Sequence, residues 1–193
     1  AASGDRVAIA PGTYGPATVD KPLTLRGEGA GSQIAIAAGQ DGLTLLADDV
    51  TVEELSITGS GSATRGVVPG MTVSGTTLRG LQITDLATAV VLRNAAAGNP
   101  LLLEASTITG AATALLADVA TSQGIGVHRN RILGPVANPG GAAVDATNNW
   151  WGTNDGPTLS GTGTDADPWL ELAVAAPSTT IRPGASAALE AGL

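Results

Sequence analysis

The sequence lacks cysteine and phenylalanine, and its 193 residues include one tyrosine, three tryptophans, one methionine and one histidine. The absence of cysteine excludes a disulfide framework and a thiolate metal site. Because large aromatic side chains are nearly missing, the 43% of apolar residues are mostly Ala, Val, Leu and Ile, which suit a narrow core between closely stacked strands. We therefore expect a globular chain with a core of small and β-branched side chains.

Charged residues are also few, at 13% of the chain, and 17 acidic residues face nine basic ones. The formal net charge of −8, without a cluster of Lys or Arg, argues against nucleic acid as a partner, because phosphate backbones are bound by basic surfaces. No apolar run approaches the roughly 20 residues that a membrane span needs. The acidity is expected to serve solubility.

What the chain does contain is a repeat, which begins with an apolar residue and places a second apolar residue five positions later. It occurs at positions 52–57, 78–83, 103–108 and 127–132. Leu25 begins an earlier unit of the same spacing, and Val144 begins a shorter one after Val127. A period of about 25 residues is too short for helical-repeat pairs, and the pattern lacks the leucine and asparagine signature of leucine-rich repeats.

A second apolar stretch recurs at positions 89–92 and 114–117, in both cases six positions after the anchor isoleucine. Two strands per coil at equal offsets are typical of a solenoid of strands. The sequence therefore predicts an all-β fold, a right-handed parallel β-helix of about six to seven coils with about 24–27 residues each.

Alternation along each strand predicts which side chains face the core. The position three residues after the anchor is predicted to point inward and becomes polar toward the C-terminal end, where hydroxyls and amides are expected to hydrogen-bond along the axis. This column consists of Leu55, Leu81, Ser106, Asn130 and Thr147.

The position after each anchor is predicted to point outward and to form a charged column. It consists of Arg26, Glu53, Arg79, Glu104, His128 and Asp145. Opposite charges on neighbouring strands attract by about 0.2–1 kcal/mol per pair, so the main interpretation is a ladder that fixes the register of the coils. The alternative is a charged strip that binds a sugar or an ion.

Two further outward columns are rich in threonine, which also suits an ice-binding surface. They consist of Ser56, Gln82, Thr107 and Arg131, and of Thr58, Thr84, Thr109 and Leu133. Only Thr107 and Thr109 form a complete Thr-x-Thr pair, and threonine is in any case a good strand residue. Ice binding is therefore a minor alternative.

Both ends of the chain resemble a known family. The stretch GDRVAIAPGTYGPATVDKPLTLRGEG, residues 4–29, resembles the opening coils of pectin-lyase-like right-handed β-helix proteins, in which a capping helix usually comes before this point. The stretches VDATNNWWGTNDGP, residues 144–157, and DADPWLEL, residues 165–172, resemble the closing coil of β-helix domains in bacterial and archaeal surface proteins. Residues 173–193 resemble the first strands of an Ig-like domain. The resemblance implies a β-helix over residues 1–172, a linker or truncated Ig-like domain over residues 173–193, and an extracellular or cell-surface location.

The closing stretch contains all three tryptophans, Trp150, Trp151 and Trp169. The end of a solenoid leaves its core open, and we expect these large side chains to form a structural cap there, with a sugar-stacking platform as the alternative. Loop residues nearby carry oxygen ligands that could hold calcium, but their spacing matches neither an EF-hand nor an RTX nonapeptide, so ordinary turn residues are the main interpretation. These residues are Asn154, Asp155, Asp165 and Asp167.

Many proteins of this fold act on acidic polysaccharides, so catalysis has to be judged from residues. The candidates are Asp48 with Asp49, Glu53 with Glu54, and the column from Glu104 to Asp145 with Arg129 and Arg131 beside it. The motif sets of polygalacturonases and alginate epimerases are missing, and coils of regular length leave no long loop to wall a cleft. No catalytic residue, cofactor site or metal site is therefore assigned.

The sequence thus favours a non-catalytic structural or adhesive module, a rigid spacer whose partners are a polysaccharide or a second copy of itself. The alternative is a domain that binds or modifies polysaccharides.

Overall fold

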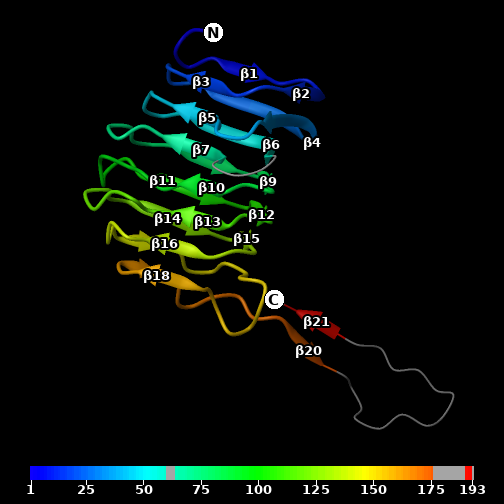
Figure 1. Cartoon of the computed structure of the whole chain (residues 1–193), viewed down its shortest axis with the longest axis vertical. Coiled ribbons are helices and arrows are strands. Elements are labelled where there is room, and N and C mark those ends of the chain that lie inside the picture. Colours follow the sequence, from blue (N-terminus) through cyan, green and yellow to red (C-terminus); the bar gives the residue numbers. More distant parts are fainter. Residues whose placement is uncertain (60–63, 176–189, 193) are drawn as a thin grey trace, which may run out of the picture.

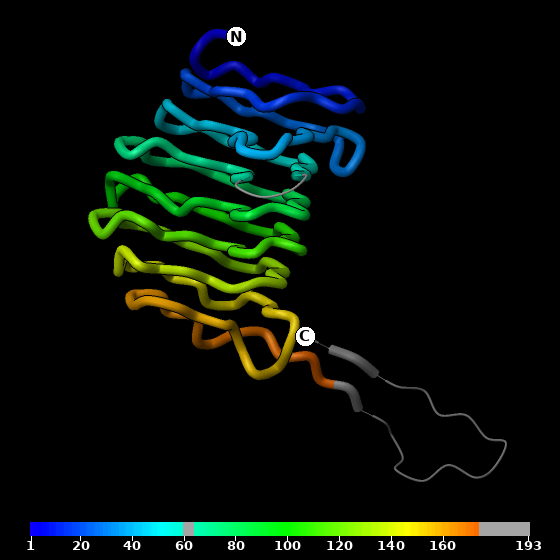
Figure 2. Tube along the Cα trace, viewed as in Figure 1, coloured from blue at the N-terminus to red at the C-terminus, as the bar shows by residue number. Residues whose placement is uncertain are grey.

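The computed structural model describes residues 1–59, 64–175 and 190–192 of the chain. Its strands are parallel and stack into a β-solenoid of about six turns, with no helix in the described ranges. Figure 1 and Figure 2 show the coils as layers along one axis, with the N-terminus at one end and the last coil at the other. The predicted all-β parallel solenoid is confirmed. Within the described part of the chain, no helix is long and apolar enough to cross a membrane.

Each coil passes over three faces, and on each face the strands of successive coils pair side by side. The first face contains β1 (Arg6–Ala8), the first half of β4 (Thr24–Ile36) and of β6 (Thr51–Gly59), β8 (Thr77–Arg79), β11 (Leu101–Glu104), β14 (Ile125–His128), β17 (Val144–Asp145) and β19 (Thr164–Asp165). The second face contains β2 (Gly12–Tyr14), the second halves of β4 and β6, β9 (Gln82–Thr84), β12 (Thr107–Thr109) and β15 (Arg131–Ile132). Eight strands stacked about 4.8 Å apart give the first face a length of about 34 Å.

The third face contains β3 (Ala17–Val19), β5 (Asp41–Leu45), β7 (Arg65–Pro69), β10 (Thr88–Val91), β13 (Thr113–Leu116), β16 (Val136–Asn138) and β18 (Leu159–Gly161). Strands β10 and β13 correspond to the predicted second strand of the repeat, and each begins one residue earlier than predicted. They pair in register, Val90 with Leu115.

A residue with positive φ turns the chain from the first face to the second in successive coils. This corner position is occupied by Glu54, Gly80, Ala105, Arg129 and Asn148, with φ between 48° and 63°. Left-handed backbone is costly for side chains other than glycine, so the corner persists because the hydrogen-bonded strands on either side of it fix its geometry. The corners stack with the coils, because the amide of Arg129 donates to the carbonyl of Asn148 at 2.9 Å.

A single apolar core runs along the axis from Val19 to Ala166. Its largest fully buried side chains are leucines and isoleucines from every central coil, including Leu43, Leu55, Ile83 and Leu103. This is the narrow aliphatic core that the composition predicts.

The register of the coil that follows β14 differs from the prediction. Val144 pairs with Ile125, and not with Val127, so this coil is longer than predicted by two positions. Ala146 therefore occupies the anchor position below Val127, and Asn149 takes the inward position that was predicted for Thr147. The physical reason is that the corners at Arg129 and Asn148 have to stack, and this fixes the register more firmly than the match between two valines.

Beyond the last coil, β20 (Ala173–Ala175) pairs antiparallel with β21 (Glu190–Gly192). Most of the segment predicted to begin an Ig-like domain lies outside the described residues, so that assignment stays a prediction.

Candidate functional site

The charged column of the first face forms in the predicted register down to His128. Arg26 pairs with Glu53, Glu53 with Arg79, Arg79 with Glu104, and Glu104 with His128 in the strand ladder. Ion pairs form at only some of these steps. Glu53 contacts Arg26 at 3.5 Å and Arg6 at 3.6 Å, and Glu104 contacts Arg129 at 2.6 Å.

Arg129 was expected only as a neighbour of this column, yet its guanidinium makes the shortest of these contacts. The corner conformation at Arg129 lets its side chain reach back by one coil to Glu104. Arg79 is exposed and makes no ion pair with any described residue. The ladder is therefore a stacked column of alternating charge with contacts at its two ends.

Asp145 does not continue the column as predicted. It lies opposite Gly126, two residues before His128 in the ladder, and its carboxylate oxygen Oδ2 reaches the imidazole Nε2 of His128 diagonally at 3.7 Å. Thr147 takes the place below His128. The shift follows from the longer coil described above.

A hollow of about 560 Å³ lies beside this diagonal contact. It is lined by His128, Arg129, Asp145, Thr147, Asn148 and Leu170. The imidazole of His128 packs over Gly126. A Cβ atom at position 126 would lie only 3.0 Å from Nε2 of His128, so the glycine makes room for the ring. Thr147, Asn148 and Leu170 were missed by the sequence reasoning because the register of this coil was displaced by two residues.

Hydrogen bonds hold the side chains around the hollow in place. The Nδ1 of His128 lies 3.1 Å from the carbonyl oxygen of Thr147, and since a carbonyl only accepts, this contact is a hydrogen bond when Nδ1 is the protonated nitrogen. The carboxylate of Asp145 accepts from the amide of Thr147 at 3.2 Å and from its hydroxyl at 2.9 Å. Asn148 donates to the same hydroxyl at 3.1 Å. An imidazole, a guanidinium, a carboxylate, a hydroxyl and an amide thus border one space, which is a set suited to hydroxyl-rich or carboxylated ligands.

The other predicted catalytic pairs are used in structural contacts. Asp48 accepts from the amide of Ser74 at 2.7 Å, and Asp49 accepts from the side chain of Asn99 at 2.8 Å. Glu53 faces two arginines, whereas the exposed Glu54 occupies a corner. The structure therefore does not bring these pairs together around a cleft.

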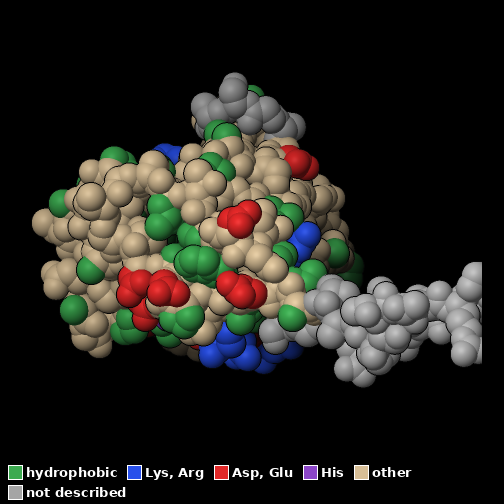
Figure 3. Space-filling model, turned by 90° about the horizontal axis from the view of Figure 1, so that it is seen from below, with side chains coloured by type: hydrophobic (Ala, Val, Ile, Leu, Met, Phe, Trp, Pro, Cys, Tyr) green, Lys and Arg blue, Asp and Glu red, His purple; other side chains and the backbone are tan. Residues whose placement is uncertain are grey.

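The predicted oxygen ligands for calcium lie in the last coil. Asn154 bonds the backbone of Leu172 through both ends of its amide, at 2.8 and 3.0 Å, so its oxygen already has a donor. Asp165 lies in register with Asp145, and its carboxylate accepts from the amide of Asp167 at 3.3 Å. Within the described residues, no group of three or more His, Cys, Asp or Glu is placed to hold a metal ion. Figure 3 shows the acidic side chains spread over this end of the molecule, with most of the visible basic side chains at one edge.

The three tryptophans occupy different positions in the last coils. Trp151 is 5% exposed and belongs to the core, where it takes the place of the anchor isoleucine below Ile132. Trp169 is half-buried and packs against the core, and its indole donates to the carbonyl of Asn154 at 3.2 Å. Trp150 instead forms an isolated bridge with Arg131 on the second face, in the outward column, because neighbouring residues of extended chain point to opposite sides. Trp151 is thus part of the core near its C-terminal end and Trp169 packs against it, whereas the capping role of the three tryptophans stays a prediction.

A buried polar ladder leads to these tryptophans. Asn130 Oδ1 accepts from the amide of Ser106, and Asn149 Oδ1 accepts from the amide of Asn130, both at 2.9 Å. Asn149 Nδ2 donates to the carbonyls of Val127 and Ala146 at 2.7 Å. The side chains are at most 2% exposed, and the ladder links three consecutive coils.

The threonine columns stack as predicted, Thr58 beside Thr84 and Thr84 beside Thr109. Gln33 donates to the hydroxyl of Thr58 at 3.2 Å, and Arg131 continues the neighbouring column after Thr107. The face is therefore mixed in side-chain size and charge, unlike a uniform array of hydroxyls.

An ion pair on the third side of the solenoid was missed by the sequence reasoning. Arg93 donates through Nε to Asp118 at 2.8 Å and through a terminal nitrogen to the carbonyl of Pro69 at 3.3 Å, so it connects the coils above and below it. The side-chain hydrogen bonds between Arg93 and Asp118 lower the pKa of Asp118 and raise the pKa of Arg93. A second pair, Asp41 with Arg65 at 2.6 Å, joins β5 to β7. The available signal was that each pair sets an acidic and a basic residue one coil apart in the sequence.

Comparison with protein-family models, with curated proteins and with solved structures finds no match to this chain.

Proposed function

We propose that this chain is a non-catalytic, rigid structural module of an extracellular surface protein. The observation that carries the proposal is the continuity of the stack, in which one aliphatic core runs through all coils and side chains connect successive coils on every face. A stack of this kind keeps its two ends at a fixed separation, because each coil contacts only its neighbours and none can move without breaking ladder hydrogen bonds. The cell-surface location rests on the resemblance of residues 144–172 to the closing coil of surface β-helix domains.

The chemistry of the hollow also supports a non-catalytic role. His128 Nε2 and Asp145 Oδ2 are 3.7 Å apart, beyond direct hydrogen-bonding distance, and the carboxylate is 60% exposed. The guanidinium of Arg129 is ion-paired with Glu104. The carboxylate of Asp145 is therefore open to water, whereas catalysis benefits from groups that are shielded from water.

A turnover assay on uronic-acid polymers, with detection of reducing ends and unsaturated products, tests this proposal. We expect no product above a blank at micromolar protein and overnight incubation. Product formation that disappears in His128→Ala or Asp145→Asn, while the far-UV circular dichroism spectrum is retained, would overturn the non-catalytic proposal.

The second candidate function is polysaccharide binding without turnover, and the hollow at His128 is the observation that favours it. Its polar lining and volume of about 560 Å³ suit a sugar-sized ligand. A glycan array followed by calorimetry tests this function, with Arg129→Ala as the site variant and Arg65→Ala, on the third face, as the matched control. Binding that is weakened about tenfold by the first substitution alone would support it, because a charge-assisted hydrogen bond contributes about 1.5–3 kcal/mol.

A further inference from the structure

Two aspartates of this chain come directly before a glycine, Asp41 before Gly42 and Asp155 before Gly156. In such a pair the amide nitrogen of the glycine can attack the carboxyl carbon of the aspartate side chain, because glycine has no side chain that shields its amide. Asparagine undergoes the same attack, but in this chain no asparagine precedes a glycine. The two Asp-Gly pairs are therefore the positions most open to a rearrangement of the main chain.

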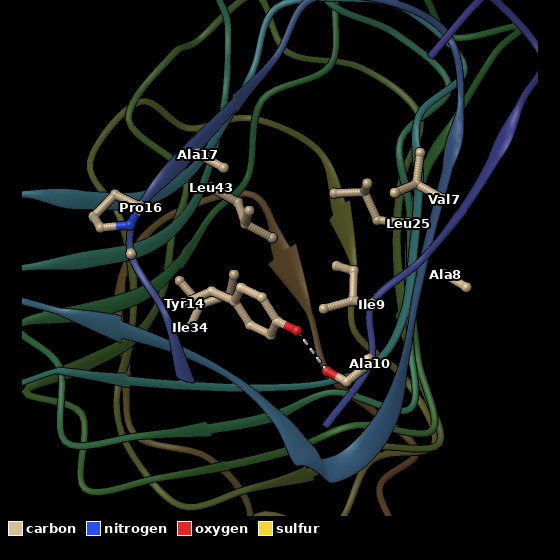
Figure 4. Close-up of a pocket in the computed structure, with 11 residues that line it drawn as sticks. Val7, Ala8, Ile9, Ala10, Tyr14, Pro16, Ala17, Leu25, Ile34 and Leu43 are labelled. Atoms are coloured by element: carbon tan, nitrogen blue, oxygen red, sulfur yellow. Dashed lines mark hydrogen bonds between the residues drawn. The ribbon is translucent and has the colours of Figure 1, made fainter. Parts of the chain in front are cut away.

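The first pair is held in place on the third face of the solenoid. The two carboxylate oxygens of Asp41 accept from Nε and from a terminal nitrogen of Arg65, both at 2.6 Å. Gly42 is buried within β5, which pairs with β3 and β7, and Leu43, the next residue, points into the interior of the solenoid (Figure 4). Reaction at Asp41 thus requires that β5 opens locally and that two charge-assisted hydrogen bonds break.

The second pair lies in the loop of residues 152–158, which leads into β18 near the C-terminal end of the stack (Figure 2). The side chain of Asp155 is exposed, and its main-chain amide donates to the hydroxyl of Thr153 at 3.0 Å. No hydrogen bond or ion pair joins the carboxylate of Asp155 or the amide of Gly156 to another described residue. Both reacting groups are thus free of competing partners in the described part of the chain.

The residues on either side of Asp155 hold the loop against the last coil. The carbonyl of Asn154 accepts from the indole of Trp169 at 3.2 Å, and its side-chain amide bonds the backbone of Leu172 at 2.8 and 3.0 Å. Gly156 lies against the same indole, since a Cβ atom there would come within 3.0 Å of the ring. The main-chain atoms of Asp155 therefore set the spacing between two residues that both contact Trp169.

We propose that Asp155 is a site of spontaneous isoaspartate formation, and that this modification releases the loop from Trp169 and Leu172. In the first step the amide nitrogen of Gly156 bonds to Cγ of the protonated Asp155 carboxyl, and the carboxyl hydroxyl leaves with the amide proton as water. The product is a cyclic succinimide. In the second step water opens the ring at the former main-chain carbonyl, so the chain continues through Cβ and Cγ of Asp155 and a carboxylate remains on Cα.

The two steps lose and regain one water, so the mass is unchanged and neither an oxidant nor a reductant is needed. The main chain becomes longer by one carbon between Asn154 and Gly156. Because both of these residues contact Trp169, the longer main chain cannot keep the two contacts in their present geometry. The proposal goes beyond the structural role of the module and does not depend on it.

Ageing of the whole chain for several weeks at physiological temperature and mildly acidic pH tests the modification. Isoaspartate is detected by labelling with an isoaspartate-specific carboxyl methyltransferase and is located by peptide mapping. We expect isoaspartate at Asp155 and at least about tenfold less at Asp41, because two charge-assisted hydrogen bonds and a strand ladder protect Asp41. In urea, which removes this protection, the two positions should react at similar rates.

The effect on the loop is measured by amide exchange at Leu172, whose amide donates to the side chain of Asn154. Leu172 should exchange faster in the aged protein than in the fresh one. Asp155→Glu is the matched control, since it keeps the charge while the attack would need a less favourable six-membered ring. We expect this variant to form no isoaspartate at this position and to keep the exchange rate of Leu172 on ageing.

The proposal fails if the folded chain forms no isoaspartate at Asp155, or if it forms equal amounts at Asp41 and Asp155. A preference for Asp155 that is just as large in urea would also refute it, because the local sequence alone would then account for the reaction. Modified protein in which Leu172 exchanges as slowly as before would show that the loop is not released.

Discussion

Replacing Asn130 by alanine should destabilise the solenoid more than the same exchange at an exposed asparagine. The side chain of Asn130 makes three buried hydrogen bonds, to the amide of Ser106, the carbonyl of Leu103 and the side chain of Asn149. Each buried hydrogen bond contributes about 1 kcal/mol net, and a partner left without a bond costs about 1–3 kcal/mol. Because the amide of Ser106 would lose its acceptor inside the core, we expect a loss of about 3–4 kcal/mol in the free energy of unfolding.

Urea unfolding followed by far-UV circular dichroism measures this loss, with amide exchange at Ser106 as a local readout. Asn154→Ala is the matched control, since it removes the same atoms and two hydrogen bonds from an exposed loop and should cost less than about 1 kcal/mol. Asn130→Asp keeps the shape but replaces the donor by an oxygen that faces two acceptors, so it should cost at least as much as alanine. If Asn130→Ala costs no more than the control, the buried ladder does not stabilise the stack.

Three further predictions concern ion pairs and the cap. Asp118→Asn should lower the free energy of unfolding by about 1–2 kcal/mol at pH 7, and the difference in stability between the two proteins should shrink as the pH falls below about 4. Because the pKa of Asp118 is lowered in the folded protein, its stabilising contribution is present above the pKa of the unfolded state and is lost as the pH falls through the pKa of the folded state. Thermal melting of both proteins from pH 7 to pH 3 checks this, and a constant difference would contradict it. Trp151→Ala should lower the free energy of unfolding in urea by about 3–5 kcal/mol, and Trp150→Ala by less than half of that. Trp151→Phe should be milder than Trp151→Ala, because the indole nitrogen of Trp151 has no hydrogen-bond partner among the described residues. Glu53→Arg should destabilise by about 1 kcal/mol at low salt, because it sets like charges against the arginines on both sides of it, and about 0.5 M salt should remove most of that loss; an equal loss at both salt concentrations would exclude electrostatics as its cause.

The fold was predictable because the solenoid repeats its physical constraints in every coil. The anchors at Val52, Leu78, Leu103 and Val127 are large apolar residues at nearly equal spacing, and the structure places all of them in the core in the predicted register. The charged column could be predicted as far as His128 for the same reason.

The register failed at the next coil because its anchor is Ala146, a side chain too small to be distinguished from loop residues. Val144 was the more apolar candidate and displaced the alignment by two residues. The asparagines could have indicated the correct register. Asn130 and Asn149 are both buried, and each follows a corner residue of positive φ, Arg129 or Asn148. The long-range ion pair between Arg93 and Asp118 could not be ranked above other charge pairs, because turn residues carry no strand alternation to indicate their direction.

The polar ladder and the tryptophans both lie in the C-terminal half of the stack, and this gives the molecule a direction. Coils near the N-terminus are connected by side chains at the surface, such as Gln33 with Thr58 and Asp41 with Arg65, whereas coils near Asn149 are also cross-linked by amide hydrogen bonds inside the core. Under a pulling force applied along the axis, the chain should peel coil by coil from the N-terminal end, and the last resistance should come from the segment between Ser106 and Trp169.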